Sequence, residues 1–236
     1  MHSDRRAALA LAIGTLAPWP AAAQKLSLSA PLTEADAENG LRIAIERAAI
    51  TAADLMGRVN AFMGNPRLRI PLPGSLDEAA RLLLAKGQRR LVGELSTAMN
   101  RAAEAAMPEA KPVLVAAVKW MSVADALAVL KGGERAATSY FEHHARSVIT
   151  EQFVPIVRRA AERMQLAQKY DSFAAAARAA SPVAPNAEDA KLAPFVARKA
   201  LDSLFVVIGD IETRIRIDPA GTTGNAFVAR VFNAVK

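Results

Sequence analysis

Apolar residues recur along most of the chain at intervals of three and four positions, which is the period of an amphipathic helix. No stretch shows the strict alternation of apolar and polar residues that is typical of a half-buried strand. We therefore predict an all-α fold, a single compact multi-helix bundle. The expected helices cover about residues 33–48, 76–86, 91–107, 113–120, 126–131, 136–146, 147–166, 192–215 and 225–232.

Local signals predict where several of these helices begin. Thr33 with Asp36 has the spacing of a capping box, and Ser122 with Asp125 repeats it. Ser75 precedes another apolar periodic stretch and is expected to be its N-cap.

Prolines interrupt the helical pattern in two places. Residues 65–74 hold three prolines within eight positions, which forbids a helix and predicts an extended path. Pro108 and Pro112 fit the opening turn of a new helix, so we expect a break after Met107. The stretch 181–186 resembles a linker but is too short to predict a domain boundary.

The start of the chain has the features of a secretory signal peptide. A charged start leads into an apolar run over residues 7–16, far shorter than the ~20 residues that a membrane span needs. Ala21 and Ala23 fit the small-residue rule for peptidase cleavage. We expect removal of residues 1–23 and a single all-helical domain over residues 24–236.

The sequence contains no cysteine, so it offers neither a disulfide nor a lipoprotein attachment site. We therefore expect a mature protein in the periplasm that carries no lipid anchor. The helix expected over 192–215 is strongly apolar, but Lys199, Asp202 and Asp210 interrupt it. We expect this helix in the middle of the bundle, and we predict no transmembrane segment.

Basic residues are in excess, with 30 Lys and Arg against 23 Asp and Glu and a formal net charge of +7. The densest basic run includes Arg158, Arg159 and Arg163, and acidic residues are interleaved with it. We expect an ordinary solvated face there, with weak contact to anionic lipid or another acidic surface as the alternative. Export argues against nucleic acid as a partner.

The sequence contains few residues that could carry catalysis. It has no zinc-protease, nucleophile-elbow, P-loop or dinucleotide-binding motif. His143 and His144 would point about 100° apart on a helix and could not both bind one metal ion. His144 lies one turn after Tyr140 and could act as a general base with it, but solvated histidines are the simpler interpretation. We predict no metal, no cofactor and no catalytic residue.

Polar residues stand where the apolar pattern does not favour them. Asn100 and Glu104 lie one turn apart on the face opposite Leu95, with Arg101 beside them. Water would cover this face by default, but the flanking alanines also permit neighbouring helices to approach.

Asp202 is the second such residue, because it lies within the most apolar helix. An ionised carboxylate there needs a partner, for instance Arg198 or Lys199, and a ligand-facing role is the alternative. Asn100, Arg101, Glu104 and Asp202 are the candidate ligand-binding residues.

Several segments follow one another in a familiar order. They are Asn65–Pro73, Met99–Ala106, Met121–Ala126, Ala137–Phe141 and Lys199–Asp202, followed by Glu212, Ile215, Arg216, Asp218 and Pro219. In this order they resemble the DUF4197 family, over about residues 41–232. The resemblance implies an exported bacterial protein with a single helical unit. It names no substrate, because the family has no established function.

The family pattern marks a set of positions in this sequence: Pro71, Pro73, Asn100, Arg101, Glu104, Asp125, Thr138, Tyr140, Asp202, Glu212 and Arg216. Ser96 stands where the pattern has glutamate, which weakens the idea of a multi-carboxylate metal site beside Glu104. Ser203 stands where it has glycine. The lipoprotein cysteine of many members is missing, which argues against membrane attachment.

These observations favour a non-enzymatic periplasmic domain that binds a protein or an envelope component. One alternative is a small-ligand pocket or enzyme that uses Asn100, Arg101, Glu104 and Asp202. The other is a peripheral binder of anionic lipid through the basic face. If the four polar side chains meet around a cavity, the pocket gains support, and if they pair off separately in a dry core, it fails.

Overall fold

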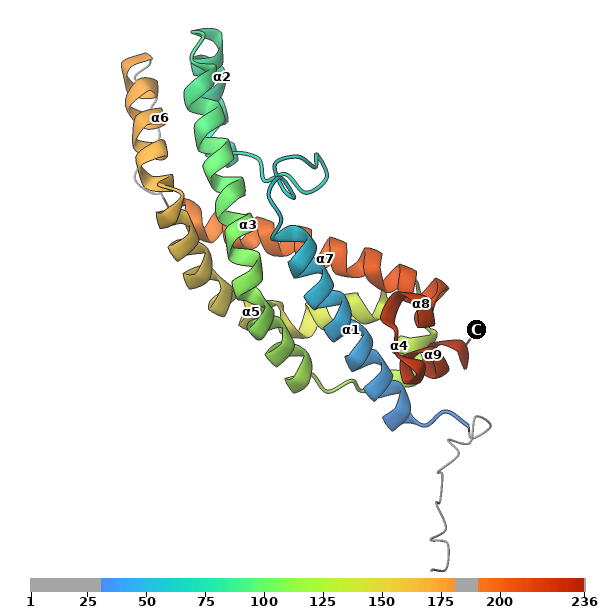
Figure 1. The fold of residues 1–236 in the computed structure, drawn as a ribbon. Helices are drawn as coiled ribbons and strands as arrows, with labels where there is room; N and C mark the ends of the chain where they lie inside the picture. The colour runs from blue at the N-terminus through green and yellow to red at the C-terminus, as the bar shows by residue number, and fades with distance from the viewer. Residues whose placement is uncertain (1–30, 181–190, 236) are drawn as a thin grey trace, which may run out of the picture. The chain divides into compact units, whose positions relative to one another are not determined.

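The computed structural model describes residues 31–180 and 191–235 of the chain, and the described residues from Leu32 onward belong to one compact unit. Every regular element in the described residues is a helix, which confirms the predicted all-α bundle (Figure 1). The elements are α1 (Glu34–Met56), η1 (Gly74–Leu76), α2 (Asp77–Ala85), α3 (Arg89–Trp120), α4 (Ala126–Lys131), α5 (Ala136–Arg163), α6 (Leu166–Ala180), α7 (Leu192–Ile217), α8 (Pro219–Thr223) and α9 (Ala226–Asn233).

The long helices α1, α3, α5 and α7 form the centre of this unit and pack against one another. The first half of α3 continues beyond them and packs with α2 and α6 (Figure 1). Many of the buried positions are alanines, which let neighbouring helix axes approach closely. At Gly40 α1 and α9 approach closely, because a Cβ there would lie 2.6 Å from a methyl group of Val231 on α9.

The capping box predicted for α1 is present, with the Thr33 hydroxyl accepting from the Asp36 N–H at 3.1 Å. The capping box predicted for α4 is wrong, since Asp125 adopts a left-handed backbone (φ 52°) and its side chain caps nothing. Glu34 instead accepts from the Leu127 N–H at 3.1 Å. A carboxylate of α1 therefore caps the start of α4, where we expected a side chain from the same segment.

The break predicted after Met107 is wrong, because α3 runs continuously through Pro108 and Pro112. Each proline removes one helical hydrogen bond and crowds the preceding turn. Tertiary packing offsets this cost: a Cβ at Gly57 would lie 2.9 Å from the Pro108 ring, so the end of α1 is shaped to receive that ring.

The break predicted at residue 147 is also wrong, and α5 continues to Arg163 with Pro155 inside it. Helix α6 was not predicted, although Leu166, Tyr170, Phe173 and Ala177 are buried at helical spacing. The N-cap role predicted for Ser75 is wrong as well. A short 3-10 turn precedes α2, and no side chain caps that helix.

The strongly apolar helix is α7, which contacts α1, α3, α5 and α8 as a central helix should. Asn225 accepts from the N–H groups of Phe227 and Val228 and begins α9 where predicted. The expected leader, its cleavage site and the stretch 181–186 lie outside the described residues. Across the described ranges, every helix is too short or too polar to cross a bilayer.

Candidate functional site

Asn100 is fully buried on α3, and its amide holds the backbone of Ile70. Its Oδ1 accepts from the Ile70 N–H at 2.9 Å, and its Nδ2 donates to the Ile70 carbonyl at 3.0 Å. The same Nδ2 donates to the Ser96 carbonyl at 2.8 Å. The side chain thus pairs with the Pro-rich segment much as a neighbouring strand would.

Glu104 lies one turn further along α3 and is only 4% exposed. Its Oε1 accepts from the N–H groups of Phe62 at 3.1 Å and Met63 at 3.3 Å. Its Oε2 accepts from Arg101 at 2.6 Å, and Arg101 also donates to the Asn60 side chain at 2.8 Å. Asn60 has a left-handed backbone (φ 68°), so these bonds fix a tight turn directly after α1.

These bonds anchor one segment, residues 57–73 between α1 and η1, which we call the 57–73 loop. Helix α7 holds the same loop from another side, because Ser203 donates to the Leu68 carbonyl at 3.3 Å and Asp210 pairs with Arg67 at 2.6 Å. The sequence left open whether water or a neighbouring helix covers Asn100 and Glu104. The structure shows that an irregular loop covers them.

Asp202 does not join this cluster. Its side chain is 48% exposed and pairs with Arg146 of α5 at 2.9 Å and with Lys199 at 3.5 Å. Arg146 also lies over the Phe205 ring, 5.1 Å from its centroid, and its pKa is raised because bonds to Glu142 and Asp202 outweigh its partial desolvation. The structure therefore brings together three of the four candidate residues, and Asp202 forms a separate surface ion pair.

A second buried carboxylate, Glu212 of α7, has a similar anchoring geometry. It accepts from the N–H groups of Ala137 at 3.0 Å and Thr138 at 2.7 Å, in the first turn of α5. A negative charge is favoured there by the unpaired amides and the helix dipole. Arg216 pairs with Glu212 at 2.8 Å and donates to the Leu130 carbonyl at the end of α4 at 2.7 Å. In the sequence, only the family resemblance had marked Glu212 and Arg216. A Glu and an Arg one turn apart in an apolar helix could also have predicted a buried ion pair.

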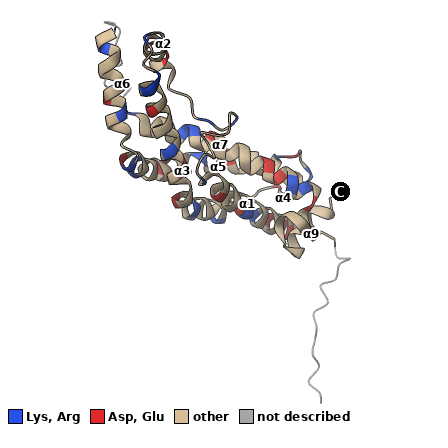
Figure 2. Ribbon diagram, turned by 45° about the horizontal axis from the view of Figure 1, so that its top comes forward, with Lys and Arg blue, Asp and Glu red and all other residues tan. Residues whose placement is uncertain are grey.

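The basic residues of the predicted surface are largely neutralised. Glu109 of α3 pairs with Arg163 at 2.8 Å and Arg159 at 3.2 Å, and the bond from Arg163 is the main reason that the pKa of Glu109 is lowered. Arg158 forms no ion pair with any described residue. Figure 2 shows acidic and basic residues interleaved along most helices, so no purely basic face stands out in that view.

Arg101 borders an open hollow of about 450 Å³ between α3 and the chain around α6. Its lining is Arg90, Gly93, Glu94, Thr97, Ala98, Arg101, Met164 and Lys169. Glu94 already pairs with Arg90 at 2.6 Å and Lys169 at 3.2 Å, and these bonds lower its pKa. Asn100 and Glu104 do not line this hollow, so the polar cluster does not converge on it.

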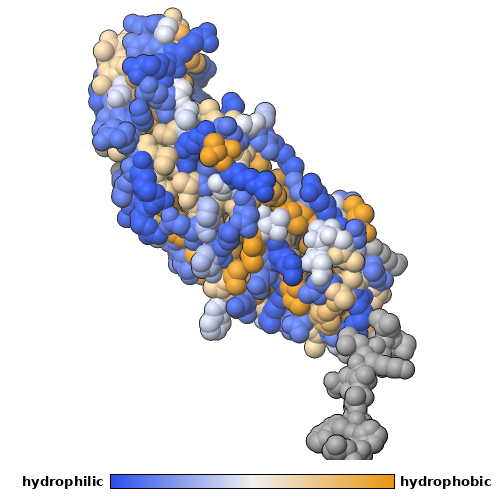
Figure 3. Space-filling model, in the orientation of Figure 1, coloured by the Kyte–Doolittle hydropathy of each residue, from blue (hydrophilic) through white to orange (hydrophobic). Residues whose placement is uncertain are grey.

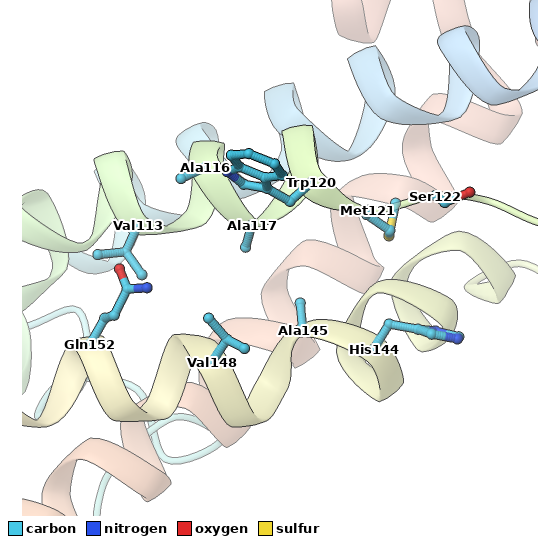
Figure 4. A pocket seen from close by; sticks show the side chains of 10 residues that line it. All are labelled: Val113, Ala116, Ala117, Trp120, Met121, Ser122, His144, Ala145, Val148 and Gln152. Atoms are coloured by element: carbon cyan, nitrogen blue, oxygen red, sulfur yellow. The ribbon is translucent and has the colours of Figure 1, made fainter.

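A different hollow, which was not predicted from the sequence, lies between α3 and α5. We call it the α3–α5 groove, and it has a volume of about 380 Å³. It is lined by Val113, Ala116, Ala117, Trp120, Met121, Ser122, His144, Ala145, Val148 and Gln152 (Figure 4). Trp120 is 88% exposed and Val148 is 51% exposed, while Ala117 of α3 and Ala145 of α5 point toward one another (Figure 4).

Polar groups stand at the two ends of the groove. At one end the Tyr140 hydroxyl donates to the Ser122 carbonyl at 2.9 Å, and the Tyr140 ring stacks on His144 with centroids 4.1 Å apart. His144 Nδ1 lies 2.8 Å from the Tyr140 carbonyl, which leaves its Nε2 as the available ring atom. At the other end Gln152 points toward Val113 and forms no side-chain hydrogen bond with a described residue (Figure 4).

Among the residues that the structure describes, no three His, Cys, Asp or Glu side chains are grouped so that they could hold a metal ion. Figure 3 shows mostly hydrophilic side chains on one face of the molecule, with apolar ones in small separate areas. Within residues 31–180 and 191–235, the large apolar side chains that are exposed are Leu55, Val59, Leu84, Trp120, Val148 and Ile217. Two of them, Trp120 and Val148, line the α3–α5 groove.

A family model described as "Protein of unknown function (DUF4197)" matches residues 31–233. This range includes both buried carboxylates, Asn100 and the whole α3–α5 groove. No curated protein matches the chain, and no solved structure matches it either.

Proposed function

The chain belongs to the DUF4197 family, and we propose that it is an exported, non-enzymatic binding protein whose binding surface is the α3–α5 groove. The partner class is a protein or another component of the cell envelope.

The exposure of Trp120 is the observation that carries this proposal. A tryptophan side chain can bury about 150–250 Å² of surface, and this residue type is enriched where binding energy concentrates. Trp120 is instead 88% exposed, and it lines the same hollow as the half-exposed Val148. An apolar hollow with few polar groups at its rim is the usual form of a binding site.

The polar clusters support a binding role rather than an enzymatic one. Catalysis by proton transfer needs a polar side chain within hydrogen-bond reach of the substrate. Asn100 and Glu104 instead bond to backbone groups of the 57–73 loop, and Glu212 bonds to backbone groups at the start of α5. Their remaining bonds go to Ser96, Arg101 and Arg216. We infer that these residues stabilise the fold.

Export to the periplasm is part of the same proposal. It is supported by the charged start, the short apolar run and the small residues at Ala21 and Ala23. Peripheral binding of anionic lipid is less favoured, because Glu109 already neutralises part of the charge on Arg159 and Arg163.

Photocrosslinking tests the proposal directly. A photoreactive phenylalanine analogue replaces Val148 in the groove or, as the matched control, Val59, which is 76% exposed on the 57–73 loop. After irradiation of cells that produce each variant, we expect an adduct with an envelope component at position 148 only. Absence of an adduct there, or the same adducts at both positions, would overturn the proposal.

A further inference from the structure

The hollow that Arg101 borders lies between the first half of α3 and the junction of α5 with α6, and we call it the α3–α6 hollow. Its lining carries three cationic side chains and one carboxylate, namely Arg90, Arg101, Lys169 and Glu94. Glu104 balances Arg101, whereas Arg90 and Lys169 share Glu94. No other described acid pairs with Arg90 or Lys169, so these two cations keep one positive charge in excess. A ligand with one negative charge would balance it.

Part of this charge is shielded from water, and a free donor lies beside it. The side chains of Lys169 and Glu94 are 35% and 31% exposed. Thr97 lines the same hollow and forms no side-chain hydrogen bond with a described residue, so its hydroxyl can donate to a ligand. An anionic group placed here would therefore meet both a cation and a hydroxyl donor.

The rest of the lining offers no polar side chain. It consists of Gly93, Ala98 and Met164, of which Ala98 is only 6% exposed. The hollow has a volume of about 450 Å³, within the usual range for ligand pockets. At about 30 Å³ for each group of the size of water, it holds on the order of 15 such groups. This space suits one short apolar chain with an anionic head.

Gly93 keeps the hollow open at a cost to helix α3. Glycine inside a helix is less stable than alanine, because it loses more backbone freedom on folding. The glycines within α1 and α7 have a packing reason, since a Cβ at Gly40 or Gly209 would lie within 3 Å of a side-chain atom of Val231 or Arg135. A Cβ at Gly93 would meet no atom within 4 Å. Packing therefore does not explain this glycine, whereas space for a ligand does.

We propose that the α3–α6 hollow binds a small organic monoanion of the chemical class of a medium-chain fatty acid. Its carboxylate lies against Lys169, Arg90 and the Thr97 hydroxyl, and its apolar chain lies over Gly93 and Met164. The site is about 30 Å along α3 from the α3–α5 groove, so it goes beyond the function proposed for that groove.

Three probes separate the contributions of charge and chain. Octanoate has both, octanamide has the same chain without the charge, and inorganic phosphate has charge without a chain. Ligand-observed NMR titration of the purified protein measures their affinities at low ionic strength. We expect saturable binding of octanoate, and binding at least about tenfold weaker for octanamide and for phosphate.

Variants of the lining locate the binding. Lys169→Gln removes a cation and should weaken octanoate binding about tenfold. Lys199→Gln is the matched control and should leave the affinity unchanged, because Lys199 also pairs with one carboxylate but lies on α7. Gly93→Leu places a side chain in the hollow and should also weaken binding at least about tenfold. Leucine is the better helix former, so this variant should melt no lower than the parent by circular dichroism.

The absence of saturable octanoate binding would overturn the proposal. Octanamide binding as tightly as octanoate would show that charge plays no part, and phosphate binding as tightly would show a site for any anion. Either result contradicts the proposed ligand class. Equal losses in the two lysine variants, or full affinity in Gly93→Leu at full helix content, would place octanoate elsewhere on the protein and would also contradict it.

Discussion

Replacing Asn100 with alanine should destabilise the protein strongly, because it strands backbone groups that no water can reach. Ile70 is only 1% exposed, and the Asn100 amide satisfies both its N–H at 2.9 Å and its carbonyl at 3.0 Å. In Asn100→Ala both groups stay buried without a partner.

The magnitude follows from these two groups. Each buried polar group left unsatisfied costs about 1–3 kcal/mol, so the pair costs about 2–6 kcal/mol. Alanine is a better helix former than asparagine by about 0.5 kcal/mol, which offsets a small part. We expect a net loss of about 2–5 kcal/mol, a large share of the roughly 5–15 kcal/mol that a domain has.

Urea unfolding followed by far-UV circular dichroism measures this loss. Thr97→Ala is the matched control, since Thr97 lies on the same helix at an open hollow and forms no side-chain hydrogen bond with a described residue. It should change the unfolding free energy by no more than about 0.5 kcal/mol. Asn100→Asp preserves the side-chain volume but cannot donate to Ile70 and buries a charge, so it should be at least as damaging as alanine. If both Asn100 variants stay within about 0.5 kcal/mol of the parent, the anchoring role is wrong.

Three further outcomes are expected. Glu212→Ala should cost about 3–5 kcal/mol in urea unfolding, because it leaves the buried N–H groups of Ala137 and Thr138 without their acceptor and removes the carboxylate that Arg216 pairs with. Asp202→Ala, at an exposed ion pair, should cost less than about 1 kcal/mol. The pKa of Glu109 is lowered by its arginine partners, so its contribution to stability is present above its ordinary pKa of about 4.3 and is lost as the pH falls further. The stability difference between the parent and Glu109→Gln should therefore shrink below about pH 4; a constant difference down to pH 3 would contradict this. N-terminal sequencing of the exported product should begin at Gln24, and a retained start would refute cleavage.

The parts of the fold that were predicted correctly are those formed by contacts between residues close together in the sequence. The capping box at Thr33 and the start of α9 at Asn225 involve contacts within three positions, and both are confirmed. The errors lie where a distant contact overrides a local rule. Helix α3 continues through Pro108, whose ring packs against Gly57 directly after α1, and no local sequence pattern predicts that contact.

In the candidate site, too, some features were predicted from the sequence and others were not. The sequence identified Asn100 and Glu104 as polar residues out of place on an amphipathic helix, and both are buried. It could not show that a loop 30 to 42 residues earlier in the chain covers them. The periodicity of a sequence indicates which residues share a helix face, but it does not indicate what packs against that face. The stripe from Val113 to Trp120 is equally ambiguous, since an exposed apolar stripe and a core stripe have the same spacing.

Stability and binding are assigned to different parts of one helix. The first half of α3 holds the 57–73 loop through Asn100 and Glu104, and its last two turns form a wall of the groove. The two sets of variants should therefore separate: Asn100→Ala lowers the unfolding free energy and leaves crosslinking from position 148 unchanged under native conditions, while Trp120→Ala does the reverse. Mutations without shared partners act independently, so the double variant should show the sum of both effects. A binding defect in Asn100→Ala at full helix content would mean that the loop and the groove are coupled through α3.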